Sequence, residues 1–549
     1  VAPKNVVVKG NANVTLQGTG SIAGTGSLNK DGEGALNLKL ENSYTGASVI
    51  HDGVINFHSI ADGGKPSALG ASIEYAQNWI WDGGKWNYTG STASTNRCAT
   101  LYKETALGVD NSSAILNLNG AFTGAGNFVV DGNGIVRPGS AKFFSYTGNT
   151  IVKSGTLQLE YIKNMTAKSH VYLGEEGNTS PKLVMAGGNF VTKSSNDQYL
   201  NYEFPIEVLE NTYSTFTIQR NCSLKCKVTG SGTLEYKIPY VREYVSGDWS
   251  GFYGTLVANG VNSDKDGSQL MLYNSGIPNA SINLKGNARI THWNPNVTVK
   301  LGGLSGDKGT YLGGTTKKTT GQTVTWQVGN ANTNETFNGV IDRRCSASGY
   351  NCNVNIVKEV SGYWRLTGSN TYNGTTIVTG GRLIIDGSNQ GTGLMTIKEN
   401  GGLSGKGTIA GDVVVSGSVQ ADLSASGSCQ PLTIKGKLTA NNATLVINME
   451  DVTGTIADDT EIKVFNLASA IQGTGFTDIQ PATPSATQLW DTSLLATKGI
   501  IKVVSNVANG ISTPSADNTS SSAIYDLTGK KTSSPKGLYI KDGKKHIAR

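Results

Sequence analysis

The chain has 549 residues, more than one ordinary compact core can hold, so several domains or a repetitive architecture are expected. Glycine supplies 71 residues, proline only 13, and charged residues 16%. This balance argues against collagen and plain disorder and favours short β-strands broken by turns. The net charge of +6 is spread thinly, and the basic C-terminal cluster is typical of a solvated tail, so no nucleic-acid partner is expected.

A Gly-rich unit opens the chain and returns later. Residues 24–28 and 32–34 match residues 124–128 and 132–134 position for position, and the first half recurs at Gly230 and Gly405. A second unit follows shortly after the first two copies. Two types of unit therefore alternate in a fixed phase, which indicates a stacked repeat architecture.

The second unit occurs three times without a gap, at residues 43–57, 145–159 and 371–385. An aromatic residue is followed by Gly at +2, apolar residues at +5 and +6, Gly at +9, and apolar residues at +11 and +13. This spacing predicts two short strands joined by a turn, with Gly381 at positive φ and Ile377 in the core.

Two short strands cannot bury their own apolar face, whereas stacked units can. The repeats therefore predict an all-β fold, a right-handed parallel β-helix (β-solenoid). Some twenty turns at about 4.8 Å per strand would give a rod roughly 100 Å long.

Residues 75–105 are rich in aromatic side chains. Trp79 and Trp81 are two positions apart, as are Trp86 and Tyr88, so each pair lies on one face of its strand. The four rings either pack inside the solenoid or form an exposed platform for sugar rings. In the second case these four residues are the candidate glycan-binding site.

Residues 196–250 break the repeat pattern most and indicate an irregular insertion leaving the solenoid. A β-helix polysaccharide lyase or glycoside hydrolase could form its cleft there, but it needs clustered carboxylates. The local acidic pairs at 175–176, 264/266 and 458–459 lie in turn-like sequence. No catalytic residue, metal site or cofactor is therefore predicted.

The six cysteines include two pairs that are close in sequence, Cys222/Cys226 and Cys345/Cys352. Each pair could close a disulfide clip in an oxidising compartment, and buried free thiols are the alternative. The first spacing could supply half a zinc site, but no matching pair lies nearby.

The C-terminal part of the sequence has a simpler pattern of short apolar strands. Strands at 462–465 and 500–504 are expected to cap the apolar end of a solenoid spanning residues 1–505. Residues 506–522 are predicted to be a linker, and 523–549 a small β module with a hairpin between 524–525 and 538–540. No apolar run is long enough to span a bilayer.

Residues 370–376 and 380–383 resemble the autotransporter-associated β-strand repeat, found in passenger domains of large bacterial surface proteins. Residues 326–368 resemble the segment leading into such a repeat, and Leu489–Leu494 resembles the passage that closes these regions. The resemblance covers roughly residues 15–505. It implies a passenger-type β-helix located outside the cell or at its surface.

The tail, residues 524–531 and 535–545, resembles the type IX C-terminal sorting module of proteins secreted by Bacteroidetes, although it is short between its two halves. That resemblance implies contact with outer-membrane or secretion machinery. The expected function is a surface adhesin or a structural, filament-forming protein that binds glycans or host or bacterial surface proteins, with end-to-end self-association left open. The alternatives are a carbohydrate-active β-helix enzyme and a glycan-binding protein.

Overall fold

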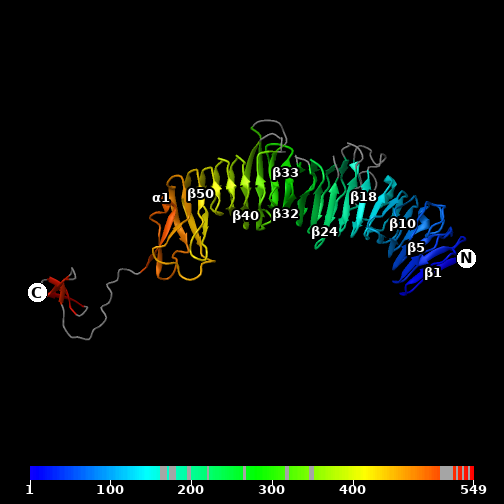
Figure 1. Ribbon diagram of the computed structural model, residues 1–549, viewed down its shortest axis with the longest axis horizontal. Coiled ribbons are helices and arrows are strands. Elements are labelled where there is room, and N and C mark those ends of the chain that lie inside the picture. The colour runs from blue at the N-terminus through cyan, green and yellow to red at the C-terminus, as the bar shows by residue number, and fades with distance from the viewer. Residues whose placement is uncertain are drawn as a thin grey trace.

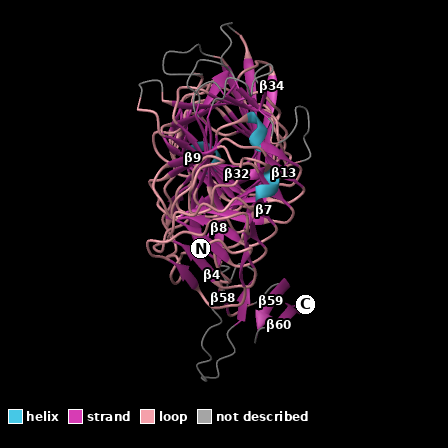
Figure 2. Cartoon of the chain, turned by 90° about the vertical axis from the view of Figure 1, so that its right-hand side faces the viewer, coloured by secondary structure: helices cyan, strands magenta, loops and turns pink. Residues whose placement is uncertain are grey.

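The computed structural model describes residues 1–160, 170–171, 173, 181–193, 200–218, 222–263, 267–315, 321–344, 352–506, 524–526, 530–534, 537–541 and 544–548. Parallel strands stack into a β-solenoid of about 18 turns, seen as a long rod in Figure 1. At about 4.8 Å per turn the rod is roughly 85 Å long. Among the described residues, α1 (Leu495–Lys498) is the only α-helix, and the view along the rod shows almost only strands and turns (Figure 2). The predicted parallel β-helix is confirmed.

The strands of successive turns form continuous sheets along the rod. One sheet runs from β1 (Asn5–Val8) to β16 (Phe144–Tyr146), and a second from β2 (Val14–Leu16) to β29 (Gly251–Phe252). A third begins at β9 (Ala93–Thr95) and reaches β54 (Gln472–Gln480). Two shorter sheets run from β19 (His170–Val171) to β38 (Val340–Ile341) and from β41 (Ser369–Asn370) to β53 (Phe465–Leu467).

The long strand β32 (Gly276–Gly286) changes how these faces join. Its pairing with β34 (Val297–Gly306) shifts register between Ile277 and Ser281, so one strand bends around a corner of the solenoid. From this turn onward, strands on two faces belong to one hydrogen-bonded sheet.

Each of the three 15-residue units forms the predicted pair of strands. The pairs are β5 (Ser48–Ile50) with β6 (Val54–Phe57), β17 (Thr150–Val152) with β18 (Thr156–Glu160), and β42 (Thr376–Val378) with β43 (Gly381–Ile385). Glycine nine positions after the aromatic residue has positive φ in every unit, +70° at Gly53, +66° at Gly155 and +61° at Gly381. The turn expected from the glycine is therefore confirmed.

The aromatic residue of each unit is a buried tyrosine, and its hydrogen-bond partner occupies the same position in each unit. Its hydroxyl forms a hydrogen bond to the hydroxyl four residues later: Tyr44 to Ser48 at 2.7 Å, Tyr146 to Thr150 at 2.6 Å, and Tyr372 to Thr376 at 2.7 Å. A buried hydroxyl without a partner would cost free energy, so this pairing lets a large ring fill the interior. Burial raises the pKa of Tyr372 to about 12.

This hydrogen bond also fixes which residues of the first strand face inward. Thr376 must point into the solenoid to reach Tyr372, and because side chains alternate along a strand, Val378 points inward as well. Ile377 is turned outward and only half-buried. The expectation that Ile377 belongs to the core is wrong, because two adjacent β-branched residues look alike in the sequence.

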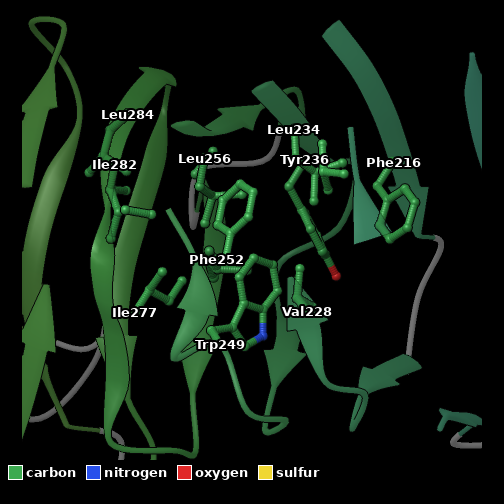
Figure 3. Packing of buried hydrophobic residues seen from close by; sticks show 14 of the residues in the cluster. Phe216, Val228, Leu234, Tyr236, Trp249, Phe252, Leu256, Ile277, Ile282 and Leu284 are labelled. Carbon is green, nitrogen blue, oxygen red and sulfur yellow. The ribbon is translucent and has the colours of Figure 1, made fainter. Parts of the chain in front are cut away.

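Residues 196–250 are not an insertion over the part that the structure describes, 200–218 and 222–250. Strands from β22 (Leu200–Tyr202) to β28 (Glu243–Val245) pair in parallel with the turns on both sides. Their rings and aliphatic side chains, including those of Phe216, Tyr236 and Trp249, fill the same continuous core (Figure 3). Polar-tipped and charged residues on inward positions, such as Tyr236 and Glu243, had disguised the alternation.

An antiparallel sheet closes the C-terminal end of the solenoid. It consists of β52 (Glu461–Lys463), β56 (Ile500–Ser505) and β55 (Gln488–Asp491). Ile462, Ile501 and Val503 bury their side chains in it, which confirms the predicted cap.

The C-terminal module is a four-stranded antiparallel sheet of β58 (Lys531–Thr532), β57 (Ile524–Asp526), β59 (Gly537–Lys541) and β60 (Lys544–Ala548). Tyr525 pairs with Ile540, as the predicted hairpin requires. The predicted linker lies almost entirely outside the described residues.

The register of the third unit can be tested with adjacent substitutions. Val378→Asp places a carboxylate in the fully buried interior and should cost about 3 kcal/mol or more, lowering the thermal unfolding temperature. Ile377→Asp, the matched control, should cost less than about 1 kcal/mol, because its side chain reaches solvent. Circular dichroism melts of both variants measure the difference. Equal losses of stability would contradict the register.

Candidate functional site

The predicted aromatic platform is not on the surface. Trp79 and Trp81 on β7 (Trp79–Trp81), and Trp86 and Tyr88 on β8 (Lys85–Tyr88), are all at most 2% exposed. The ring centroids of Trp79 and Trp81 lie 5.3 Å apart, and those of Trp79 and Trp86 5.7 Å. Both pairs occupy the inward positions of their strands, so they cannot stack on a sugar. The interior alternative is the one observed.

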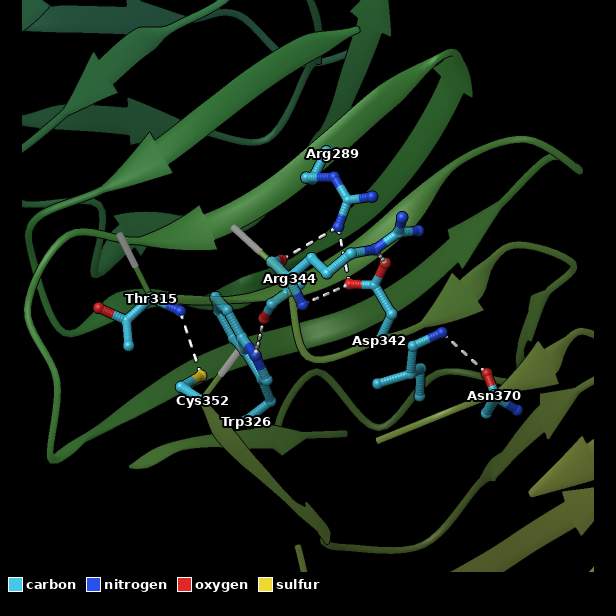
Figure 4. Close-up of polar contacts among 9 residues, drawn as sticks. Arg289, Thr315, Trp326, Asp342, Arg344, Cys352 and Asn370 are labelled. Carbon is cyan, nitrogen blue, oxygen red and sulfur yellow. Dashed lines mark hydrogen bonds and ion pairs between the residues drawn. The ribbon is translucent and has the colours of Figure 1, made fainter. Parts of the chain in front are cut away.

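A buried ion-pair cluster lies on another face, between β33 (Ala288–His292) and β38 (Figure 4). Arg289 Nη1 donates to Asp342 Oδ1 at 2.7 Å, and Arg344 Nε donates to Asp342 Oδ2 at 3.0 Å. The Arg289 guanidinium also packs 4.2 Å from the centre of the Tyr311 ring. Because both carboxylate oxygens are engaged, this cluster fixes neighbouring turns and leaves little capacity to bind a ligand.

Carboxylates in residues 196–250 do not converge on a cleft. Glu235 faces outward, where its Oε1 accepts a 2.6 Å hydrogen bond from Asn259 Nδ2. Glu243 points inward, is fully buried, and has no hydrogen-bond partner at either oxygen. The residue paired with Glu243 on the next turn is Leu270, and the residue paired with Leu270 on the turn after that is Ile290. Burial raises the pKa of Glu243 well above its ordinary value of 4.5.

The other local acidic pairs also give no catalytic arrangement. Asp458 Oδ1 accepts from Gln488 Nε2 at 2.7 Å, and Asp459 forms an ion pair with Lys502 at 2.7 Å, so both stabilise turns of the cap. The pairs at 175–176 and 264/266 lie outside the described residues. Within the described part of the chain, no group of three or more His, Cys, Asp or Glu side chains is arranged to hold a metal ion.

Cys98, Cys226 and Cys429 follow the free-thiol alternative. Cys226 is a buried free thiol, so the Cys222/Cys226 clip is not formed, and burial raises its pKa to about 12. Cys352 Sγ accepts a hydrogen bond from the Thr315 amide at 3.3 Å, whereas its predicted partner Cys345 lies outside the described residues (Figure 4).

One surface feature was missed by the sequence interpretation. It is a polar hollow of about 450 Å³ on the outer face of β40 (Tyr363–Leu366), β43, β46 (Gly401–Ser404) and β49 (Ser418–Asp422). Tyr363, Arg382, Gly402, Ser418 and Gln420 lie along it, and the turn containing Glu399 and Asn400 forms a wall. We call this feature the outer hollow.

Two smaller depressions adjoin the outer hollow. One of about 360 Å³ shares Gln420 and reaches Asn448, Glu450 and Gln480. The other, of about 340 Å³, includes Arg365, whose guanidinium pairs with Asp386. Together they make the outer face of the last turns an indented surface.

The repeat units resemble a known family. Residues 28–56, 140–159 and 361–385 match the passenger-associated-transport-repeat family model, and these segments contain the β-strand pairs described above. The three units are similar to passenger-associated transport repeats. The matched residues cover part of the solenoid.

A relative points the same way. The chain is 33% identical over 150 residues, 27% of its length, to the adhesin BmaC autotransporter of Brucella suis biovar 1 (strain 1330). The match spans only 4% of that relative's length. Passenger repeats, an adhesin relative and the solenoid fold together fit a surface adhesin or structural role. No helix among the described residues is long and apolar enough to cross a lipid bilayer.

The buried Glu243 should make stability depend on pH. Because folding raises its pKa, its contribution to stability is complete below about pH 4.5 and is lost as pH rises toward the folded-state pKa. Glu243→Gln removes this loss, so its unfolding temperature should exceed that of the wild type by a margin that grows above pH 4.5. Melts from pH 4 to 8 measure the margin, with the exposed Glu33→Gln as control. A margin independent of pH would contradict a buried, unpaired carboxyl.

The thiol assignment has a chemical test. Cys226 should resist iodoacetamide in the native protein at pH 8, because its sulfur is buried and its pKa is about 12. Cys98, which is only partly buried, is the internal comparison and should react first. Peptide mass spectrometry measures both. Rapid native alkylation of Cys226, or a disulfide between Cys222 and Cys226, would contradict the assignment.

Proposed function

We propose that this chain is the rod-like binding part of an extracellular or cell-surface bacterial adhesin. The observation that carries the proposal is that three segments matching the passenger-associated-transport-repeat model form strand pairs of one parallel solenoid, in a chain similar over 150 residues to an autotransporter adhesin. A solenoid places every turn in contact only with its neighbours, so its length can vary without a new core. Such a rod holds a binding surface away from the cell.

The outer surface of the rod is suited to repeated polar contacts. Asn56 Nδ2 donates to Asn37 Oδ1 at 2.8 Å, and Asn87 Nδ2 donates to Asn56 Oδ1 at 2.8 Å, forming an amide ladder on successive turns. The ladder satisfies the amides in a fixed spacing and leaves a rigid polar face. We propose glycans or surface proteins of other cells as the partners.

Two further proposals concern the cap of the solenoid and the C-terminal module. The cap covers the apolar interior beneath Ile462 and Ile501, which disfavours filament growth through that end. The four-stranded module from β57 to β60 supports a role in sorting, through contact with outer-membrane or secretion machinery of the type IX kind known in Bacteroidetes.

Adhesion can be measured directly. Beads carrying the folded protein should bind to cultured epithelial cells or to matrix-coated wells several-fold more than beads carrying Val378→Asp, whose fold is weakened. Ile377→Asp, expected to stay folded, should adhere like the wild type. Folded wild-type protein that adheres no better than uncoated beads on every surface would overturn the proposal.

A further inference from the structure

We infer that the outer hollow is a binding site for a neutral, polyhydroxylated glycan, held by Tyr363, Arg382, Glu399 and Gln420 around Gly402. Its biological role rests on the proposed adhesin function, but the binding itself does not. The argument starts from how successive turns place these residues together.

The hollow is formed by a missing side chain in an otherwise regular column. Tyr363 is in register with Arg382, Arg382 with Gly402, and Gly402 with Ser418, so the four positions lie side by side on consecutive strands. Gly402 supplies no side chain between the long Arg382 and the short Ser418. The floor of the hollow is therefore backbone, and its rim is polar.

The backbone does not need glycine at this position. The φ of Gly402 is outside the left-handed region, unlike that of Gly381 at +61°. A Cβ on Gly402 would meet Ser418 Oγ at 3.2 Å and, at 3.4 Å, both Arg382 Cγ and the backbone oxygen of Gly381. What this glycine provides is open space above the sheet.

The charged groups at the rim have hydrogen-bonding capacity that the fold does not use. Arg382 and Glu399 form no side-chain hydrogen bond or ion pair with any residue that the structure describes. Arg289 and Arg365, by contrast, are both paired with aspartates. Gln420 Nε2 donates to Asp422 Oδ1 at 2.6 Å, which fixes the orientation of its amide at the hollow.

The lining selects the chemical class of ligand. One guanidinium and one carboxylate cancel in charge, which disfavours a phosphate or a polyanion. Planar guanidinium, carboxylate and amide groups can each bridge two adjacent hydroxyls, and the Tyr363 ring, whose centroid lies 5.9 Å from the Arg365 guanidinium carbon, can pack against sugar C–H groups. A protein partner would need buried apolar anchors, and the hollow offers only Tyr363 for that purpose.

The adjoining depressions indicate an oligosaccharide rather than a single sugar. The outer hollow and the depression at Asn448 meet at Gln420, and they extend from β40 to β51 (Leu438–Asn448). Four strand spacings of about 4.8 Å give a binding face roughly 19 Å long. An extended chain of sugars can occupy both depressions at once.

The test is a titration of the full chain with neutral mannan, galactan and glucan oligosaccharides, followed by calorimetry. Wild-type protein should bind at least one series. Gly402→Phe fills the hollow, and Arg382→Ala removes its main donor, so each should weaken binding about tenfold or more. Lys237→Ala, outward on β27 (Thr233–Ile238) of the same sheet, is the matched control and should bind like the wild type.

Each result decides the matter. Melting temperatures of both hollow variants should stay within about 3 °C of the wild type, since neither touches the core. Wild-type protein that binds none of the three series overturns the inference, even if the beads adhere to cells, in which case the adhesin function stands. Glycan binding that persists in both variants places the ligand elsewhere and also overturns the site. Glycan binding without cell adhesion would support the site and contradict the adhesin role.

Discussion

Parallel, in-register pairing between consecutive turns is the constraint on which the rest of this molecule depends. Each strand forms its backbone hydrogen bonds with the strands of the preceding and the following turn. Residues that are paired along the rod therefore all point to the same side of the sheet, either inward or outward. A single inward column can thus be apolar for several turns, as at Leu270, Ile290 and Leu312. Glu243 belongs to the same column and has no hydrogen-bond partner at either oxygen, so its carboxylate form destabilises this turn.

The same constraint explains how the polar surface acquires its shape. Positions that are neighbours on the outer face are neighbours in every turn, so one small residue makes a hollow and one long residue makes a ridge. Gly402 and Arg382 show both cases on adjacent strands. The rod's binding surface can therefore change at the outward positions while the inward tyrosine pairs, such as Tyr372 and Thr376, keep the fold.

The fold could be predicted from the sequence because the repeat contains residues that each favour a single local structure. The turn glycine at Gly381 and the alternation of Leu383 and Ile385 allow few other structures. The inward side of the first strand was misassigned because Ile377 and Val378 are equally good β-formers. The recurring hydroxyl four residues after the tyrosine was the signal that would have settled it.

The outer hollow could not be predicted in the same way. Tyr363, Arg382, Gly402 and Ser418 are separated by 19, 20 and 16 residues, and these unequal turns give no periodic pattern in the sequence. The aromatic residues at 79–88 failed as a site for the opposite reason. Their two-residue spacing fixes a shared face but not whether that face is inside.

The direction of the interstrand hydrogen bonds has a mechanical consequence. They run along the rod, so a pull on its two ends loads them one turn after another instead of shearing many together. In the first part of the rod one turn contains about 20 residues, as between Leu28 and Ser48, and once peeled it supplies roughly 65 Å of extended chain. A rod built in this way yields in steps under tension and dissipates force turn by turn.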